Sequence, residues 1–125
     1  MSDLNSKLQK RYDQETQTIR SIWDTMVKES AQLKLDESLS QEIPDFAACR
    51  LQKDDFDSSE SLYCEWRDEG GNIKGHIVLH ANGSVFAEYD LLQYHPTEKH
   101  RFIEAVSVFG RSDQLASELR YIDAG

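Results

Sequence analysis

The segment from Ser61 to Asp90 constrains the fold of this chain more than any other, because two independent patterns in it agree. Apolar and polar side chains alternate along three stretches, which indicates three strands with one mostly apolar face. The segments between them carry Gly70-Gly71 and Asn82-Gly83, which are typical of hairpin turns because such turns need residues that adopt positive φ. We therefore predict a three-stranded antiparallel meander.

The turn lengths fix the register of this meander. We expect a two-residue turn at Gly70-Gly71, which pairs side chains of like faces. In the second hairpin a two-residue turn would place Ile77 opposite Glu88 and mix the faces, so we expect a three-residue turn over residues 81–83 with Gly83 in the left-handed conformation. The expected cross-strand pairs are Leu62 with Leu79, Cys64 with Ile77, Trp66 with Gly75, Leu79 with Val85, and Ile77 with Ala87.

The same register brings Glu65, His76 and Glu88 side by side on the polar face of the meander. Directly paired side chains on neighbouring strands are close enough to touch, and two carboxylates favour the charged form of a histidine between them. Such a trio is suited to general acid–base chemistry or to part of a metal site, although the pattern by itself favours a cross-strand ionic ladder on a solvent-exposed face. Side chains that would line a ligand site beside it are Tyr63, Phe86 and Arg67.

Composition narrows the classes of partner. The 125 residues suit a single domain over residues 1–125, large enough to fold without metals or disulfides. The chain has 14 Lys and Arg against 23 Asp and Glu, a formal charge of −9 that disfavours nucleic acid and anionic membrane surfaces. Neither a signal peptide nor an apolar run of about 20 residues is visible. With only Cys49 and Cys64 present, we expect a cytoplasmic location and a buried free thiol at Cys64.

The N-terminal segment has the periodicity of an amphipathic helix over residues 3–35, or of two helices in series. Glu15 and Thr16 interrupt its apolar stripe. About 30 helical residues span roughly 45 Å, whereas a compact domain of this size has a radius of gyration near 14 Å. We therefore expect the helix to bend, to break near residues 13–18, or to project beyond the body of the domain, where its end would need a partner such as a second copy of the chain.

The rest of the chain completes the sheet. A polar connection over residues 36–45 precedes a first strand over 46–52 and a loop over 54–61. Residues 93–100 contain Pro96 and are expected to form a loop. Residues 101–110 and 115–122 fit both helix and strand spacing. We predict a final hairpin that turns at residues 110–114, with a terminal helix as the alternative.

Other histidine and acidic patterns carry less chemistry. His76 and His80 have the spacing of a helical zinc site, but in a strand they lie about 13 Å apart. His95 and His100 are expected to be surface residues of a loop. Asp54, Asp55 and Asp57 resemble an acidic calcium loop but lack its glycine and its bidentate glutamate, so we expect no EF-hand. No nucleophile, phosphate-binding or dinucleotide motif is present, and we expect no metal and no cofactor.

These patterns together predict an α+β fold, in which a long N-terminal amphipathic helix (residues 1–35) packs on a curved antiparallel meander of five or six strands (residues 46–122). The function that they favour is a non-enzymatic cytoplasmic interaction module that self-associates or binds another protein. The alternative is a small-molecule-binding protein or enzyme that uses the polar sheet face around His76, with Glu65 and Glu88 orienting it. The expected core consists of Trp23, Met26, Val27, Cys64, Trp66, Ile77, Leu79, Val85, Ala87 and Tyr89.

Overall fold

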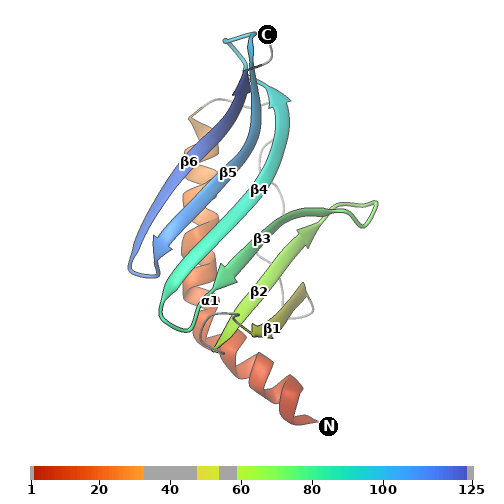
Figure 1. Cartoon of the computed structure of the whole chain (residues 1–125), viewed down its shortest axis with the longest axis vertical. Coiled ribbons are helices and arrows are strands. Elements are labelled where there is room, and N and C mark those ends of the chain that lie inside the picture. The colour runs from red at the N-terminus through yellow and green to blue at the C-terminus, as the bar shows by residue number, and fades with distance from the viewer. Residues whose placement is uncertain (1, 33–47, 54–58, 124–125) are drawn as a thin grey trace.

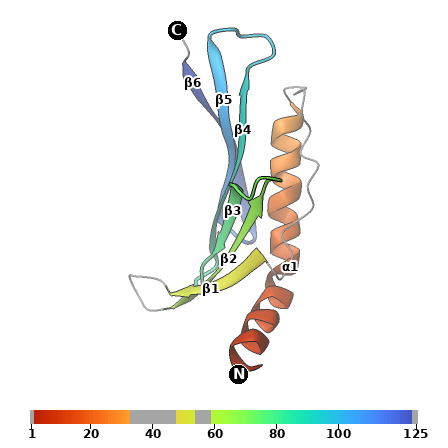
Figure 2. The ribbon, with the colours of Figure 1, turned by 90° about the vertical axis from the view of Figure 1, so that its right-hand side faces the viewer.

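The structure, a computed structural model that describes residues 2–32, 48–53 and 59–123, confirms the α+β fold: one helix packs on a six-stranded antiparallel meander. The strands follow one another in sequence order across the sheet, and α1 lies on one of its two faces (Figures 1 and 2). The elements are α1 (Ser2–Ala31), β1 (Cys49–Lys53), β2 (Glu60–Arg67), β3 (Ile73–Leu79), β4 (Ser84–Tyr94), β5 (Arg101–Arg111) and β6 (Gln114–Asp123).

Helix α1 is continuous over its 30 residues, so the expected break near residues 13–18 is wrong. The helix bends instead, and its N-terminal end extends past the sheet (Figure 2). In the bent region the Thr16 hydroxyl donates a hydrogen bond of 2.7 Å to the Tyr12 carbonyl oxygen, a contact that commonly bends helices. The buried seam of the helix consists of Ile19, Ile22 and Met26.

The central meander has the predicted register. Cys64 pairs with Ile77, which pairs in turn with Ala87, and Trp66 pairs with Gly75. The second turn is confirmed: the Gly83 N–H donates to the His80 carbonyl oxygen at 3.1 Å, and Gly83 has a φ of 93°. The turn residues and the alternation of apolar side chains therefore predicted correctly which side chains share a face of the meander.

The first turn differs from the prediction in its length. The Gly71 N–H donates to the Asp68 carbonyl oxygen at 3.0 Å and Gly71 has a φ of 83°, so the turn has three residues rather than two. The Asp68 carboxylate accepts hydrogen bonds from the N–H groups of Gly70 and Asn72, both at 2.9 Å, which stabilises the longer turn. A bulge between Trp66 and Arg67 absorbs the extra residue, so the downstream pairs are preserved.

The C-terminal third forms two long strands. The final hairpin is confirmed, with Arg111 paired to Gln114, and the alternative of a terminal helix is wrong. Strand β4 continues through Tyr94, so the loop begins two residues later than the predicted start at Gln93. The first strand is β1, which lies within and just beyond the predicted range 46–52.

The core is larger than predicted, and one predicted member lies outside it. Val27 is 38% exposed, because it sits about 100° around the helix from Met26 and thus beside the buried seam. Trp23 is half-buried and packs on the core beside Trp66, with ring centroids 5.4 Å apart. Cys64 is a buried free thiol, as expected. Buried core residues that were not predicted are Ile19, Ile22, Leu62, Leu91, Ile103, Val106 and Val108.

Several predictions fall outside the described residues. They concern residues 33–35 of the helix, the connection over 36–45, Phe46 and Ala47 of the first strand, and the acidic group Asp54, Asp55 and Asp57.

Candidate functional site

The sheet face opposite α1, called the outer face below, carries the predicted trio. Glu65 pairs directly with His76, and His76 pairs directly with Glu88. The pairing continues through Ser107 on β5 to Glu118 on β6, so the three residues belong to a row of five that crosses five strands. We call this the histidine row.

Each glutamate beside His76 is held by an arginine. The Arg67 guanidinium donates to Glu65 Oε1 from Nε at 3.0 Å and from Nη2 at 2.7 Å, and Nη1 donates to the Gly71 carbonyl oxygen at 2.6 Å. The Arg120 guanidinium lies 2.7 Å from the Glu88 carboxylate. These ion pairs shield the carboxylates, whose side chains are only 11% and 21% exposed. The two glutamates are therefore engaged in pairs of their own.

Aromatic rings lie on both sides of His76. The Tyr63 ring stacks on the imidazole with centroids 5.9 Å apart, and the Phe86 ring lies 5.8 Å away on the other side. The Arg50 guanidinium covers the Tyr63 ring at 4.2 Å from its centroid. Partial burial and the nearby Glu65 carboxylate raise the pKa of the Tyr63 hydroxyl above its usual value. His76 thus lies half-buried in a layer of rings rather than exposed on a polar surface.

A second row on the outer face is mostly apolar and crosses all six strands. Phe86 and Phe109 pair directly and are 37% and 36% exposed, so two phenyl rings lie side by side at the surface. We call this the aromatic row. Its members in strand order are Arg50, Tyr63, Val78, Phe86, Phe109 and Ala116.

A third apolar group lies at the far ends of β4, β5 and β6, which extend beyond the C-terminal end of α1 in both ribbon views (Figures 1 and 2). Tyr94 pairs with Phe102, which pairs with Ile122. Tyr94 is 65% exposed and Ile122 is 49% exposed. We call these three residues the distal row. Ile122 and Ala116 are an even number of residues apart on a regular strand, so the distal row and the aromatic row share the outer face.

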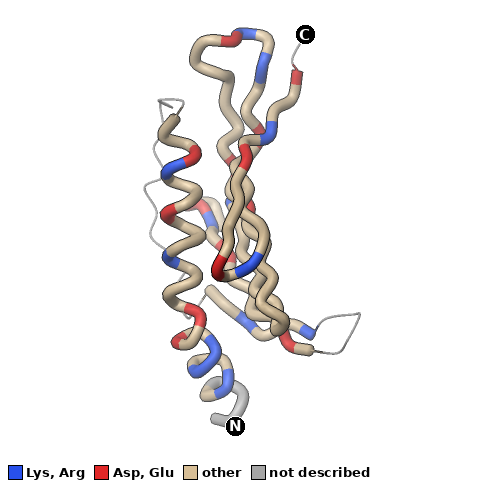
Figure 3. The backbone as a smooth tube through the Cα atoms, turned by 90° about the vertical axis from the view of Figure 1, so that its left-hand side faces the viewer, with Lys and Arg blue, Asp and Glu red and all other residues tan. Residues whose placement is uncertain are grey.

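Charged groups surround Asp90 on β4. Burial, followed by the nearby carboxylates of Glu88 and Glu104, raises the pKa of Asp90, and Arg120 and Lys74 oppose this effect. Acidic and basic positions are interspersed along α1 rather than segregated (Figure 3). Within the described ranges, no group of three or more His, Cys, Asp and Glu side chains is arranged to hold a metal ion.

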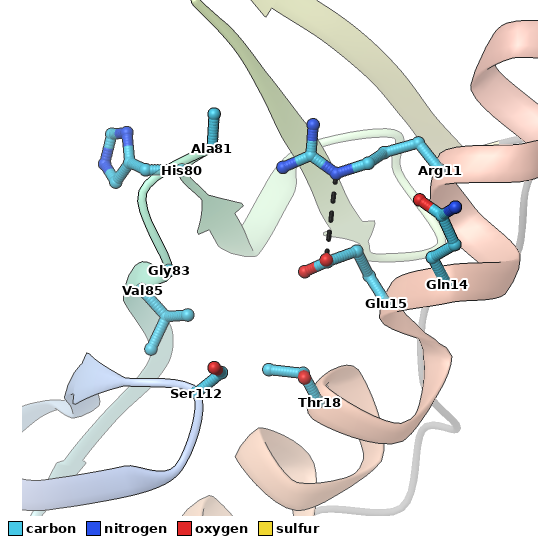
Figure 4. A pocket seen from close by; sticks show the side chains of 9 residues that line it. All are labelled: Arg11, Gln14, Glu15, Thr18, His80, Ala81, Gly83, Val85 and Ser112. Carbon is cyan, nitrogen blue, oxygen red and sulfur yellow. Dashed lines mark ion pairs between the residues drawn. The ribbon is translucent and has the colours of Figure 1, made fainter.

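A half-open cleft of about 320 Å³ lies between the N-terminal half of α1 and the turns β3–β4 and β5–β6 (Figure 4). Three of its polar side chains, Arg11, Glu15 and His80, have partners in the protein. The Arg11 guanidinium donates to the carbonyl oxygens of Glu60 and Leu79 at 2.9 and 3.0 Å and lies 3.8 Å from Glu15. His80 Nδ1 is 3.1 Å from the Ser61 hydroxyl. Arg11, which lines the cleft, therefore connects the helix to the sheet.

The remaining histidines separate into two cases. His100 is exposed, as expected. His95 is not a surface residue, because its side chain is only 10% exposed. Its Nδ1 accepts hydrogen bonds from the N–H groups of Thr97 and Glu98 at 3.2 and 3.0 Å, so it closes the loop rather than facing solvent. His76 lies within a strand and His80 directly follows it, so their spacing does not produce a helical zinc site.

Sequence reasoning missed the groups that complete the outer face. Arg50, Ser107, Glu118 and Arg120 belong to strands whose register the alternation did not determine. Extending the Tyr63 and His76 rows to the neighbouring strands identifies Arg50, Ser107 and Glu118, whereas Arg120 lies in the next row, opposite Ala105. Of the described residues, none forms a helix long and apolar enough to cross a membrane. Comparison of the chain with protein-family models, with curated proteins and with solved structures gave no match.

Proposed function

We propose that this chain is a non-enzymatic protein-interaction module that self-associates through its sheet. The observation that carries the proposal is the outer face, which none of the described elements covers and where the aromatic row places the directly paired Phe86 and Phe109 at the surface. Exposed aromatic groups within a polar surround are characteristic of binding surfaces, because covering them removes apolar area from water.

The histidine row supports binding rather than catalysis. In the catalytic alternative Glu65 and Glu88 orient His76 as the proton-transfer group, but each of these glutamates is paired with an arginine. Arg50 on Tyr63 adds a cation–π contact, which gives the row the combination of aromatic and arginine side chains that is enriched at protein interfaces.

The sheet is a better candidate for the interface than the projecting helix end. Arg11 is bonded to the sheet, Lys7 forms an ion pair with Glu60, and Leu8 and Tyr12 pack on the core. The N-terminal part of α1 that these residues occupy therefore already contacts the sheet of its own chain. A partner would find more accessible apolar surface on the outer face.

Sedimentation velocity of the full chain over a range of concentrations tests the proposal. We expect a reversible increase in mass, and a substitution Phe109→Ser that weakens it. Val27→Ser is the matched control, because Val27 has a similar exposed fraction, 38% against 36%, but lies on the helix. A chain that stays monomeric at all concentrations would refute self-association.

The alternative is a small-molecule-binding protein or enzyme built around His76. It is supported by the rings of Tyr63 and Phe86, which form two apolar walls beside the imidazole. Arg67 would then close one side of the site. In a two-dimensional NMR screen of small aromatic and anionic compounds, shifts confined to Tyr63, His76 and Phe86 would support this function over the first. We also propose that the interaction module is cytoplasmic, as its cysteine usage leads us to expect.

A further inference from the structure

Strand β6 is one edge of the sheet, and the hydrogen-bonding direction of each of its residues follows from the neighbouring strands. The strand order ends at β6, which has ten residues, whereas the opposite edge, β1, has only five. The Ser112 N–H donates to the Gly83 carbonyl oxygen at 3.0 Å, so even-numbered residues of β5 point their backbone groups toward β4. Odd-numbered residues of β5 therefore bond to their even-numbered partners on β6.

It follows that the odd-numbered residues of β6 direct their N–H and C=O groups away from the sheet. These residues are Leu115, Ser117, Leu119 and Tyr121. In the part of the chain that the structure describes, no strand pairs with this side of β6. Such an edge is a template for a further strand, because each unpaired backbone group gains a hydrogen bond when one is added.

Charge selects one register for the pairing of β6 with β6 of a second copy. When two identical strands pair antiparallel about a two-fold axis at Leu119, Glu118 of each lies opposite Arg120 of the other. An axis at Glu118 would place two glutamates opposite each other, and an axis at Arg120 would place two arginines together. Like charges directly opposite destabilise a sheet, whereas opposite charges stabilise it.

The side chains concerned have capacity for this contact. Glu118 is exposed and has no ion-pair partner among the residues that the structure describes. Arg120 binds Glu88 through Nη2, and its side chain is still 39% exposed. A guanidinium has five N–H donors, so Arg120 is able to hold Glu88 and the second copy's Glu118 together.

The apolar rows select the same register independently. With the axis at Leu119, Ala116 of one copy lies opposite Ile122 of the other. Ala116 ends the aromatic row and Ile122 ends the distal row, so each aromatic row continues into the distal row of the second copy. The result is a twelve-stranded sheet crossed by two unbroken apolar rows that run from Arg50 of one copy to Tyr94 of the other.

We propose that the partner of this module is a second copy of the chain, and that the two copies join through an antiparallel β6–β6 pair centred on Leu119, with Glu118 opposite Arg120 on both sides. This inference rests on the proposed self-association and places its interface at the β6 edge, where Ile122 of the second copy meets Ala116, the direct neighbour of Phe109, and extends the aromatic row without covering the outer face. A second copy of the chain fits the β6 edge, because the charges and the apolar rows are self-complementary about Leu119.

Ser117→Pro tests the edge. Proline removes an N–H group that points away from the sheet, so the β5–β6 pairing is kept and only the added strand loses its bond. We expect the dissociation constant measured by sedimentation velocity to rise by roughly tenfold or more, since the symmetric pair loses the bond twice. Ser117→Ala is the matched control and should leave the dissociation constant unchanged. Circular dichroism and a urea midpoint establish that both variants are folded.

A charge exchange tests the register. Glu118→Lys and Arg120→Glu should each weaken self-association by roughly tenfold, because each places like charges opposite each other twice. An equimolar mixture of the two variants should associate as tightly as the unsubstituted chain. In a mixed pair the introduced lysine of one variant lies opposite the introduced glutamate of the other, and the remaining Arg120 lies opposite the remaining Glu118.

The outcomes separate the two proposals. An unsubstituted chain that is always monomeric overturns both the self-association and this interface. A chain that associates with full affinity despite Ser117→Pro, or charge variants that fail to complement each other, overturn the interface alone.

Discussion

At Gly75, β4 approaches β3 closely. A Cβ atom built there would lie 2.6 Å from the Glu88 carbonyl oxygen and 3.0 Å from two atoms of Tyr89. The obstacle includes backbone atoms of the central meander, which cannot move without disturbing the pair that joins His76 to Glu88. The close approach also allows the Trp66 and Tyr89 rings to meet with centroids 5.5 Å apart above the glycine.

Gly75→Ala should therefore lower the free energy of unfolding by about 1–3 kcal/mol, the range found when extra methyl groups are forced into a packed interior. Urea denaturation measures it. Gly70→Ala is the control, because its Cβ would meet only side-chain atoms at 3.4 Å. That variant should stay within about 0.5 kcal/mol of the unsubstituted chain. Equal effects of the two substitutions would contradict the steric explanation.

Asp90 gives the fold a pH dependence of definite sign. Its pKa is raised, first by burial and then by Glu88 and Glu104, so the folded state binds its proton more tightly than the unfolded chain does. The ionised carboxylate therefore destabilises the fold at neutral pH, and protonation removes this cost as the pH falls through the raised pKa. Asp90→Asn should increase the free energy of unfolding at pH 7, and the increase should vanish below the ordinary aspartate pKa of 3.8.

Asp68 supplies the opposite case for that experiment. Hydrogen bonds from the N–H groups of Asn72 and Gly70 lower its pKa, so its ionised form stabilises the turn above the ordinary pKa and the effect is lost as the pH falls. Asp68→Asn should thus lower the stability at pH 7, in contrast to Asp90→Asn. Urea denaturation at a series of pH values measures both. The same sign for the two variants would contradict this assignment.

At the scale of elements, Arg11 joins α1 to the sheet in addition to the apolar seam and the Lys7–Glu60 ion pair. The Arg11 guanidinium donates to the carbonyl oxygens of Glu60 and Leu79, which begin β2 and end β3. Arg11→Met keeps the aliphatic stem but leaves two partly buried carbonyl oxygens without their donor. We expect a loss of about 2 kcal/mol in the free energy of unfolding. Arg20→Met, at an exposed position of the same helix, should change it by less than about 0.5 kcal/mol.

The predictability of each strand depended on whether its two faces differ. In β2, β3 and β4 one face is mostly buried and the other is not, so the alternation together with the turn residues gave the correct pairs. In β5 the run Ala105 to Val108 is buried on both faces, which removes the alternation and leaves helix and strand equally plausible. The first turn was predicted one residue too short, because the hydrogen bonds of Asp68 were not inferred from the glycine pair.

The candidate site shows the same limit. Glu65, His76 and Glu88 were placed together correctly because all three lie in the predictable meander. Their arginine partners were not anticipated for two different reasons. Arg67 lies two residues from Glu65 on the same face of β2 but was assigned to a ligand site rather than to the glutamate, and Arg120 reaches Glu88 across β5, two strands away. Directly paired neighbours in a meander can be predicted from a single sequence more readily than long side chains that reach a residue from a more distant strand.

At the scale of the whole molecule, α1 covers one face of the sheet, no other element in the described ranges covers the opposite face, and β6 lies at an edge. A chain with a formal charge of −9 gives a pair with twice that charge, −18. The two copies therefore repel each other electrostatically, and this repulsion acts before they come into contact. The Glu118–Arg120 pairs act only at contact, beside apolar rows that salt does not weaken.

These two ranges of interaction predict the response to salt. Raising the ionic strength from about 0.02 to 0.3 M shortens the screening length from roughly 20 to 6 Å, which suppresses the repulsion between the two acidic molecules more than the contact pairs. We expect self-association measured by sedimentation velocity to strengthen by roughly two- to tenfold over this range. The double variant Glu118→Lys/Arg120→Glu keeps the net charge and the complementary contacts, so it should respond to salt in the same way. Affinity that falls steeply with salt would mean that ion pairs, rather than the apolar rows and the backbone edge, hold the two copies together.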